Sequence, residues 1–153
     1  MRKIVLVCMF TVGITGAFAQ NSGLGIGIVG DIGVPSNYGG GLSLKIPSVP
    51  IYWTINGGSS GLYVAGDMHF LNGSIIPTLL YFVGAGAFAG LGLWNSAFTV
   101  GVGVRGVAGL SWQPIDLIEV FVQAVPSLGV QIGSSTGLWE NFLSGNIGLR
   151  IWL

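Results

Sequence analysis

Alternation of apolar with polar or small residues is the feature that most constrains how this chain can fold. Residues 62–70 divide into two faces, of which the apolar one consists of Leu62, Val64, Met68 and Phe70. Successive side chains of an extended strand point to opposite sides, so a period of two predicts a strand. The same alternation recurs in residues 42–46, 51–56, 118–123 and 146–153. The chain is therefore predicted to be all-β, with one apolar face on its strands.

Composition indicates what the apolar faces contact. Charged residues make up only 7% of the 153 residues, and the mean hydropathy is +0.79. Soluble domains carry roughly 25% charged residues, so this chain lacks the polar surface that water requires. Strands with one apolar and one polar face are typical of transmembrane barrels that turn the apolar face to lipid. The predicted fold is a transmembrane antiparallel up-and-down β-barrel.

A helical membrane protein built around residues 75–93 is the alternative architecture. The stretch is apolar and long enough to cross a bilayer as a helix. Pro77 near its start and four glycines within it disfavour a helix. The alternation in the rest of the chain favours the barrel.

Eight strands are expected, at residues 22–30, 39–46, 50–57, 61–71, 79–92, 97–112, 117–132 and 143–153. Both chain ends then lie on the periplasmic side, with turns there at 47–49, 72–78 and 113–116. The outward loops are 31–38, 57–60, 93–96 and 133–142. Which residues of 79–92 face inward is left open. Four tryptophans near strand ends are expected to form an aromatic girdle at the membrane interface: Trp94, Trp112, Trp139 and Trp152.

The first 19 residues have the pattern of a secretory signal peptide. Arg2 and Lys3 precede an apolar stretch, and residues 17–19 form an Ala-Phe-Ala cleavage site. Cys8 lies inside this stretch, but Val7 before it is not small, which disfavours a lipoprotein. We expect residues 1–19 to be removed, residues 20–153 to form the barrel, and the protein to be exported to the outer membrane.

Two other functions are disfavoured by the residues. A dinucleotide-binding motif, G-x-G-x-x-G, is matched by Gly25, Gly27 and Gly30. Turn-forming residues follow these glycines where that motif requires a helix. We expect Gly25 and Gly27 to face a crowded barrel interior instead. After signal cleavage, three basic residues stand against five acidic ones. No basic patch exists, so nucleic acid is not an expected partner.

The chain resembles the small eight-stranded outer-membrane barrels of spirochaetal bacteria, a family of unassigned function often compared with OmpX, OmpW and the OmpA barrel. The resemblance rests on "GIGIVGDIGVPSNYGGGLSLK", "LYVAGDMHFL", "GVRGVAGLSWQPIDLIEVFVQAVPSLGV" and "IGLRIWL". It implies the eight-stranded fold and matches Asp67, Arg105 and Arg150 to polar positions of that family. Gln123 stands where members often carry an acidic residue. The last strand looks like an outer-membrane sorting signal, although it ends in Leu153 rather than Phe.

The polar faces of the strands predict a network inside the barrel, formed by Lys45, Asp67, His69, Arg105, Glu119, Gln123 and Arg150. Antiparallel order places Glu119, early in its strand, beside Arg150, late in the next. An eight-stranded barrel is just wide enough to be filled by side chains, and buried charges must be paired. The network is therefore expected to be a structural plug, with a gate or a proton-linked route as the sharper alternative.

No enzyme, metal site or cofactor is expected. Asp67 and His69 suggest acid–base chemistry, but they lie toward the periplasmic end without a neighbouring Ser. His69 has no second His or Cys to share a metal. The expected function is a structural barrel, or one that passively admits small apolar molecules. The alternative is a surface adhesion barrel that uses its short loops. Expected partners are the lipid bilayer and the barrel insertion machinery, and the chain is expected to be monomeric.

Overall fold

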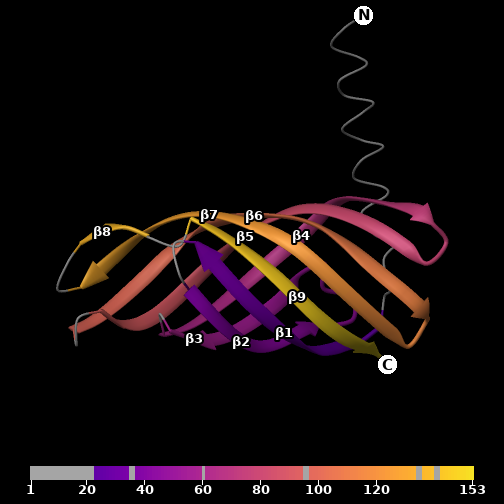
Figure 1. Ribbon diagram of the computed structural model, residues 1–153, viewed down its shortest axis with the longest axis horizontal. Helices are drawn as coiled ribbons and strands as arrows, with labels where there is room; N and C mark the ends of the chain where they lie inside the picture. The colour runs from indigo at the N-terminus through magenta and orange to yellow at the C-terminus, as the bar shows by residue number, and fades with distance from the viewer. Residues whose placement is uncertain (1–22, 35–36, 60, 95–96, 134–135, 140–141) are drawn as a thin grey trace, which may run out of the picture.

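The computed structural model describes residues 23–34, 37–59, 61–94, 97–133, 136–139 and 142–153, so the expected signal peptide lies outside the described residues. Every regular element among the described residues is a strand (Figure 1). Eight strands are long: β1 Gly25–Val34, β2 Asn37–Lys45, β3 Tyr52–Gly58, β4 Gly61–Ile76, β5 Leu79–Trp94, β6 Ala97–Ile115, β7 Ile118–Gly133 and β9 Leu143–Trp152. A two-residue strand, β8 Gly137–Leu138, lies between β7 and β9 in the chain.

The eight long strands close into a barrel. Each strand from β1 to β7 pairs antiparallel with the next, and β9 pairs with both β7 and β1. This arrangement confirms the predicted all-β, antiparallel, up-and-down barrel of eight strands. The strand β8 adds only to the edge of β7, at Val130 and Gln131.

The two ends of the barrel carry different parts of the chain. The terminal end holds Gly23 and Leu153, together with the β4–β5 and β6–β7 turns, and lies at the right of Figure 1. The loop end holds the β1–β2, β3–β4 and β5–β6 connections and β8.

The helical alternative is wrong. Residues 75–93 form the end of β4 and most of β5, and these two strands pair antiparallel along their length. Among the residues that the structure describes, no helix is both long and apolar enough to cross a membrane.

Several strands are longer than expected, because pairing with neighbours continues past the local sequence signals. β1 runs to Val34 where a loop from residue 31 was expected, since Asp31 pairs with both Gly39 and Asn146. β4 runs to Ile76 where a turn from residue 72 was expected. Shifts of register after His69 and after Ser74 break the alternation of β4 without ending its pairing with β5.

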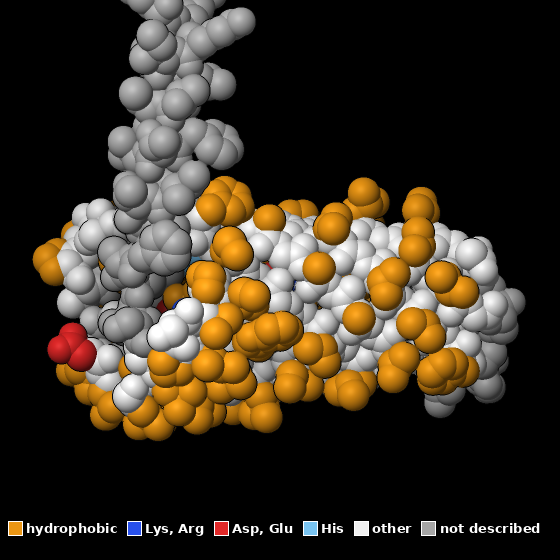
Figure 2. All heavy atoms as spheres, turned by 180° about the vertical axis from the view of Figure 1, so that it is seen from behind, with side chains coloured by type: hydrophobic (Ala, Val, Ile, Leu, Met, Phe, Trp, Pro, Cys, Tyr) orange, Lys and Arg blue, Asp and Glu red, His pale blue; other side chains and the backbone are white. Residues whose placement is uncertain are grey.

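The outer wall of the barrel is apolar, as the alternation predicts. Ile28, Val104 and Ile147 expose 64%, 61% and 61% of their surface, and hydrophobic side chains are spread along the wall, most densely toward the terminal end (Figure 2). On β5, whose faces were left open, Phe82 and Phe88 point inward while Tyr81 and Leu91 point outward. Exposed apolar surfaces of this extent mark sites that contact another protein or a membrane.

Glycines on the inner face make room for large inward side chains. A Cβ at Gly148 would overlap the Phe121 ring, and one at Gly109 would lie 2.7 Å from the Phe82 ring. At Gly25, a Cβ would lie 2.6 Å from Cδ of Arg150 and 3.1 Å from the Trp152 ring. The glycine-rich first strand therefore borders a crowded interior, as expected.

Candidate functional site

The barrel interior is the candidate site, because the polar side chains converge there. All seven residues of the predicted network lie on inward faces, and none is more than 9% exposed: Lys45, Asp67, His69, Arg105, Glu119, Gln123 and Arg150. They occupy two layers, one in the terminal half of the lumen and one nearer its middle.

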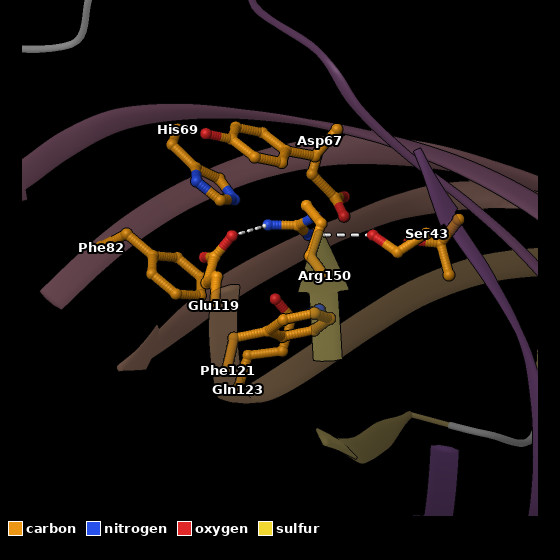
Figure 3. Close-up of a pocket in the computed structure, with 10 residues that line it drawn as sticks. Ser43, Asp67, His69, Phe82, Glu119, Phe121, Gln123 and Arg150 are labelled. Atoms are coloured by element: carbon orange, nitrogen blue, oxygen red, sulfur yellow. Dashed lines mark hydrogen bonds and ion pairs between the residues drawn. The ribbon is translucent and has the colours of Figure 1, made fainter. Parts of the chain in front are cut away.

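The terminal layer is built around Glu119 and Arg150, which are direct cross-strand partners on β7 and β9. Nη1 of Arg150 lies 2.6 Å from Oε2 of Glu119 (Figure 3). Trp152 donates from Nε1 to the same oxygen at 2.9 Å, and Ser111 donates to Oε1 at 2.7 Å. Nη2 of Arg150 donates at 2.8 Å to Ser43 on β2, which is separated from β9 by β1. The carboxylate and the guanidinium thus hold four strands together.

Aromatic rings fill the space around this ion pair. The Arg150 guanidinium lies 4.6 Å from the Phe121 ring and 5.0 Å from the Tyr52 ring, a distance at which cation–π attraction operates. His69 is stacked between Tyr52 and Phe82, with centroid distances of 4.2 Å and 4.3 Å. The cavity left between these groups has a volume of about 10 Å³, which is room for roughly one water molecule.

A second ion pair joins Asp67 on β4 to Arg105 on β6, two strands that are not neighbours. Nε and Nη2 of Arg105 both donate to the carboxylate, the first at 2.7 Å. Gly86 of β5 pairs with Asp67 on one side and Arg105 on the other, and a Cβ at Gly86 would overlap Oδ1 of Asp67. The absence of a side chain at Gly86 therefore lets the two charged groups meet across β5.

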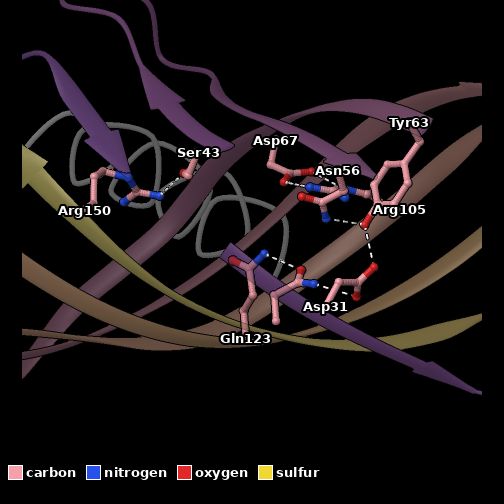
Figure 4. Close-up of polar contacts among 9 residues, drawn as sticks. Asp31, Ser43, Asn56, Tyr63, Asp67, Arg105, Gln123 and Arg150 are labelled. Carbon is pink, nitrogen blue, oxygen red and sulfur yellow. Dashed lines mark hydrogen bonds and ion pairs between the residues drawn. The ribbon is translucent and has the colours of Figure 1, made fainter. Parts of the chain in front are cut away.

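Asp31 is a member of the network that the sequence analysis missed. Its carboxylate accepts from the Tyr63 hydroxyl and from Nδ2 of Asn146, both at 2.7 Å (Figure 4). Asn56 donates to the Tyr63 hydroxyl at 2.6 Å, and Gln123 donates to Oδ1 of Asn146 at 3.0 Å. Asp31 has the same parity along β1 as Gly25 and Gly27, a signal that was outweighed by the turn-forming residues after it.

Lys45 takes no part in either of these two ion pairs. Its Nζ donates to the carbonyl oxygens of Ile46 and Val49, at 3.1 Å and 2.6 Å, in the turn that follows β2. It thereby fixes a turn at the terminal end instead of joining the plug.

The expected aromatic girdle needs correction. Trp112 points outward and is 49% exposed, but Trp152 is only 6% exposed and its indole lies inside the barrel beside Glu119. Trp139 also turns inward and packs on Phe88 at a centroid distance of 5.1 Å. The reason is that inward glycines leave space for these rings. The side chain of Trp94 lies outside the described residues.

The polar groups inside the barrel are bonded mainly to one another, as in a structural network. The three carboxylates of Asp31, Asp67 and Glu119 each accept at least two hydrogen bonds from protein groups. Within the described part of the chain, no three His, Cys, Asp or Glu side chains are grouped so that they could hold a metal ion. The network links strands that do not pair with each other: β4 with β6, β2 with β9, and β1 with β4.

Comparison with known proteins gives a fold and no family. No family model and no curated protein matches the chain. A solved chain described under "De novo design of transmembrane beta-barrels" matches with a TM-score of 0.54 and 13% sequence identity, covering 88% of this chain and 98% of that chain. This protein therefore shares its fold with a designed transmembrane β-barrel.

Proposed function

We propose that this chain is a small integral outer-membrane β-barrel with a closed lumen and a structural role, with no catalytic activity. Residues 1–19 serve as a cleaved signal peptide, and residues 20–153 are folded into the membrane by the barrel insertion machinery as a monomer. The proposal includes a relationship to the spirochaetal eight-stranded barrels that the chain resembles.

The observation that carries the proposal is the division between the two faces of the wall. Outward side chains such as Ile28, Val104 and Ile147 are apolar and exposed, whereas inward ones such as Asp67 and Glu119 are 2% exposed. A closed barrel pairs its backbone groups internally, which is the condition for strands to cross a bilayer. The same division is the signature of transmembrane barrels.

The filling of the lumen supports a structural role over transport. Inward glycines could leave open space, but Phe88 and Trp139 occupy it in the loop half. In the terminal half, the Glu119–Arg150 pair and the stacked rings of Tyr52, His69 and Phe82 span the interior.

Planar-bilayer recording tests the closed lumen. Protein whose folding has been verified by a heat-sensitive gel shift should show no stable conductance of porin size, because both halves are filled. A large, persistent conductance from the same preparation would contradict the plug and favour a channel.

Single-cysteine labelling tests the location and orientation. Residues 20–153 contain no Cys, since Cys8 is the chain's one cysteine, so each introduced thiol can be labelled alone. Thr136→Cys at the loop end should react with a membrane-impermeant maleimide on intact cells, whereas Asp116→Cys in the β6–β7 turn should react only after the membrane is disrupted. Reversed reactivity would contradict the orientation. If neither thiol reacts on intact cells, the result would contradict a surface location.

A further inference from the structure

The loop half of the lumen contains a flat slot that is occupied by the indole of Trp139. The indole packs on Phe88 with an angle of 53° between the ring planes. A Cβ at Gly101 would lie 2.5 Å from Cε3 of Trp139, and one at Gly90 would lie 3.6 Å from Cη2. Bare backbone of β5 and β6 therefore forms the wall against which the indole rests.

The adjoining layer repeats this construction with Phe88. A Cβ at Gly103 would lie 2.7 Å from the Phe88 ring, and one at Gly129 would lie 2.9 Å from it. Four glycines on three strands thus leave a side-chain-free surface that accepts planar rings. Nothing in that surface requires the second ring to be attached to the chain.

Polar groups border the slot. Tyr63, Arg105, Ser127 and Ser144 line the cavity beside Trp139, whose volume is about 20 Å³. Thr99, two residues from Gly101 on the same inward face of β6, is 5% exposed, and its Oγ1 is buried without a hydrogen-bond partner. An unsatisfied buried hydroxyl costs free energy, and a polar group on a bound molecule would relieve it.

Residues 136–139, the described part of the segment that carries Trp139, make few backbone hydrogen bonds with the barrel wall. The amide of Trp139 donates to the Gly129 carbonyl at 2.9 Å, and β8 before it pairs with β7 only at Val130 and Gln131. Local opening of a short segment costs less free energy than unfolding of the whole barrel.

We propose that this slot is a binding site for a small planar aromatic molecule that carries a polar group, and that Trp139 occupies it when the ligand is absent. The ligand stacks on Phe88 and on the backbone of Gly90 and Gly101, and its polar group faces the hydroxyl of Thr99. Binding displaces Trp139 toward the mouth of the barrel. The inference does not depend on an outer-membrane location, so its failure would leave the proposed function standing.

Fluorine NMR of protein labelled with fluorotryptophan tests the exchange directly, with benzimidazole as the probe. The Trp139 resonance is assigned by its loss in Trp139→Phe, a variant that also keeps a ring in the slot. Benzimidazole should shift the Trp139 resonance saturably. Trp112 on the outer wall is the control, because a probe that merely enters the detergent would shift Trp112 without saturation.

Two substitutions test whether the probe occupies the slot. Trp139→Ala removes the competing indole, so benzimidazole should bind about tenfold more tightly than to the wild type. Adding Gly101→Val to this variant places a side chain in the slot and should abolish binding. Folding of each variant is verified by the gel shift, and Trp139→Val, which also removes the competing ring, replaces Trp139→Ala if the latter does not fold.

Two outcomes would overturn the proposal. Absence of a saturable shift in the wild type would show that Trp139 does not yield to a ligand. This conclusion would hold even if Trp139→Ala bound the probe, because truncation alone can create a cavity. Binding that survives Gly101→Val would place the ligand elsewhere.

Discussion

Glu119 and Arg150 face each other across β7 and β9, with 2.6 Å between Oε2 and Nη1, and both are less than 5% exposed. The pair lies where the last strand, β9, meets β7, near the end of the barrel that holds the C-terminus. Its carboxylate also accepts from Ser111 and Trp152. One buried ion pair therefore fastens the last strand to the rest of the wall.

Breaking this pair from one side should be costly. Glu119→Gln or Arg150→Met leaves the other charge buried without its partner, which typically costs about 3–5 kcal/mol. The double variant should lose less stability than the two single losses combined, because no unpaired charge remains. Urea unfolding in lipid vesicles measures all three variants, and strict additivity would mean that the two residues do not interact.

Arginine on the outer wall of β7 should destabilise the barrel according to depth. Val122→Arg places a charge opposite Ile147, in the middle of the neighbouring strand β9, and should cost about 2–4 kcal/mol, whereas Ile132→Arg near the loop end should cost about 0–1 kcal/mol. Both side chains point outward, at 50% and 57% exposed, so the pair differs mainly in depth. Unfolding free energies in vesicles give the comparison, and equal small losses would indicate that this wall does not face lipid.

Two glycines that lie close together on β9 and β1 should respond oppositely to alanine. Gly148→Ala places a Cβ that overlaps the Phe121 ring and lies 2.6 Å from the Ile28 carbonyl oxygen, so overpacking should cost about 1–3 kcal/mol. Gly30→Ala meets only ordinary contacts at 3.8 Å and should be neutral or slightly stabilising. The thermal midpoint of the gel shift distinguishes them, and similar midpoints would contradict the tight packing inside the barrel.

Residues 1–19 should be absent from the mature protein. The Ala-Phe-Ala site at residues 17–19 predicts Gln20 as the first residue. Mass spectrometry of the protein isolated from membranes measures the mass and the N-terminus. An acylated Cys8 would identify a lipoprotein instead.

Adjacent-strand contacts were accessible from the sequence, whereas contacts across the lumen were not. Glu119 and Arg150 meet because β7 and β9 are neighbours and antiparallel, so strand order alone predicted their pairing. Asp67 and Arg105 lie on strands separated by β5, and their contact depends on the register of both pairings and on the missing side chain at Gly86.

The sequence by itself determined the strands, their two faces and the closed barrel, because alternation depends only on the geometry of an extended backbone. Tertiary structure alone decided that Asp31 joins the buried network and that Trp139 and Trp152 turn inward. Their orientation depends on the space that glycines on other strands leave free and on how far each strand remains paired with its neighbours. Closure of the barrel sets both this space and the extent of pairing, since it fixes the register of every strand against strands distant in the sequence.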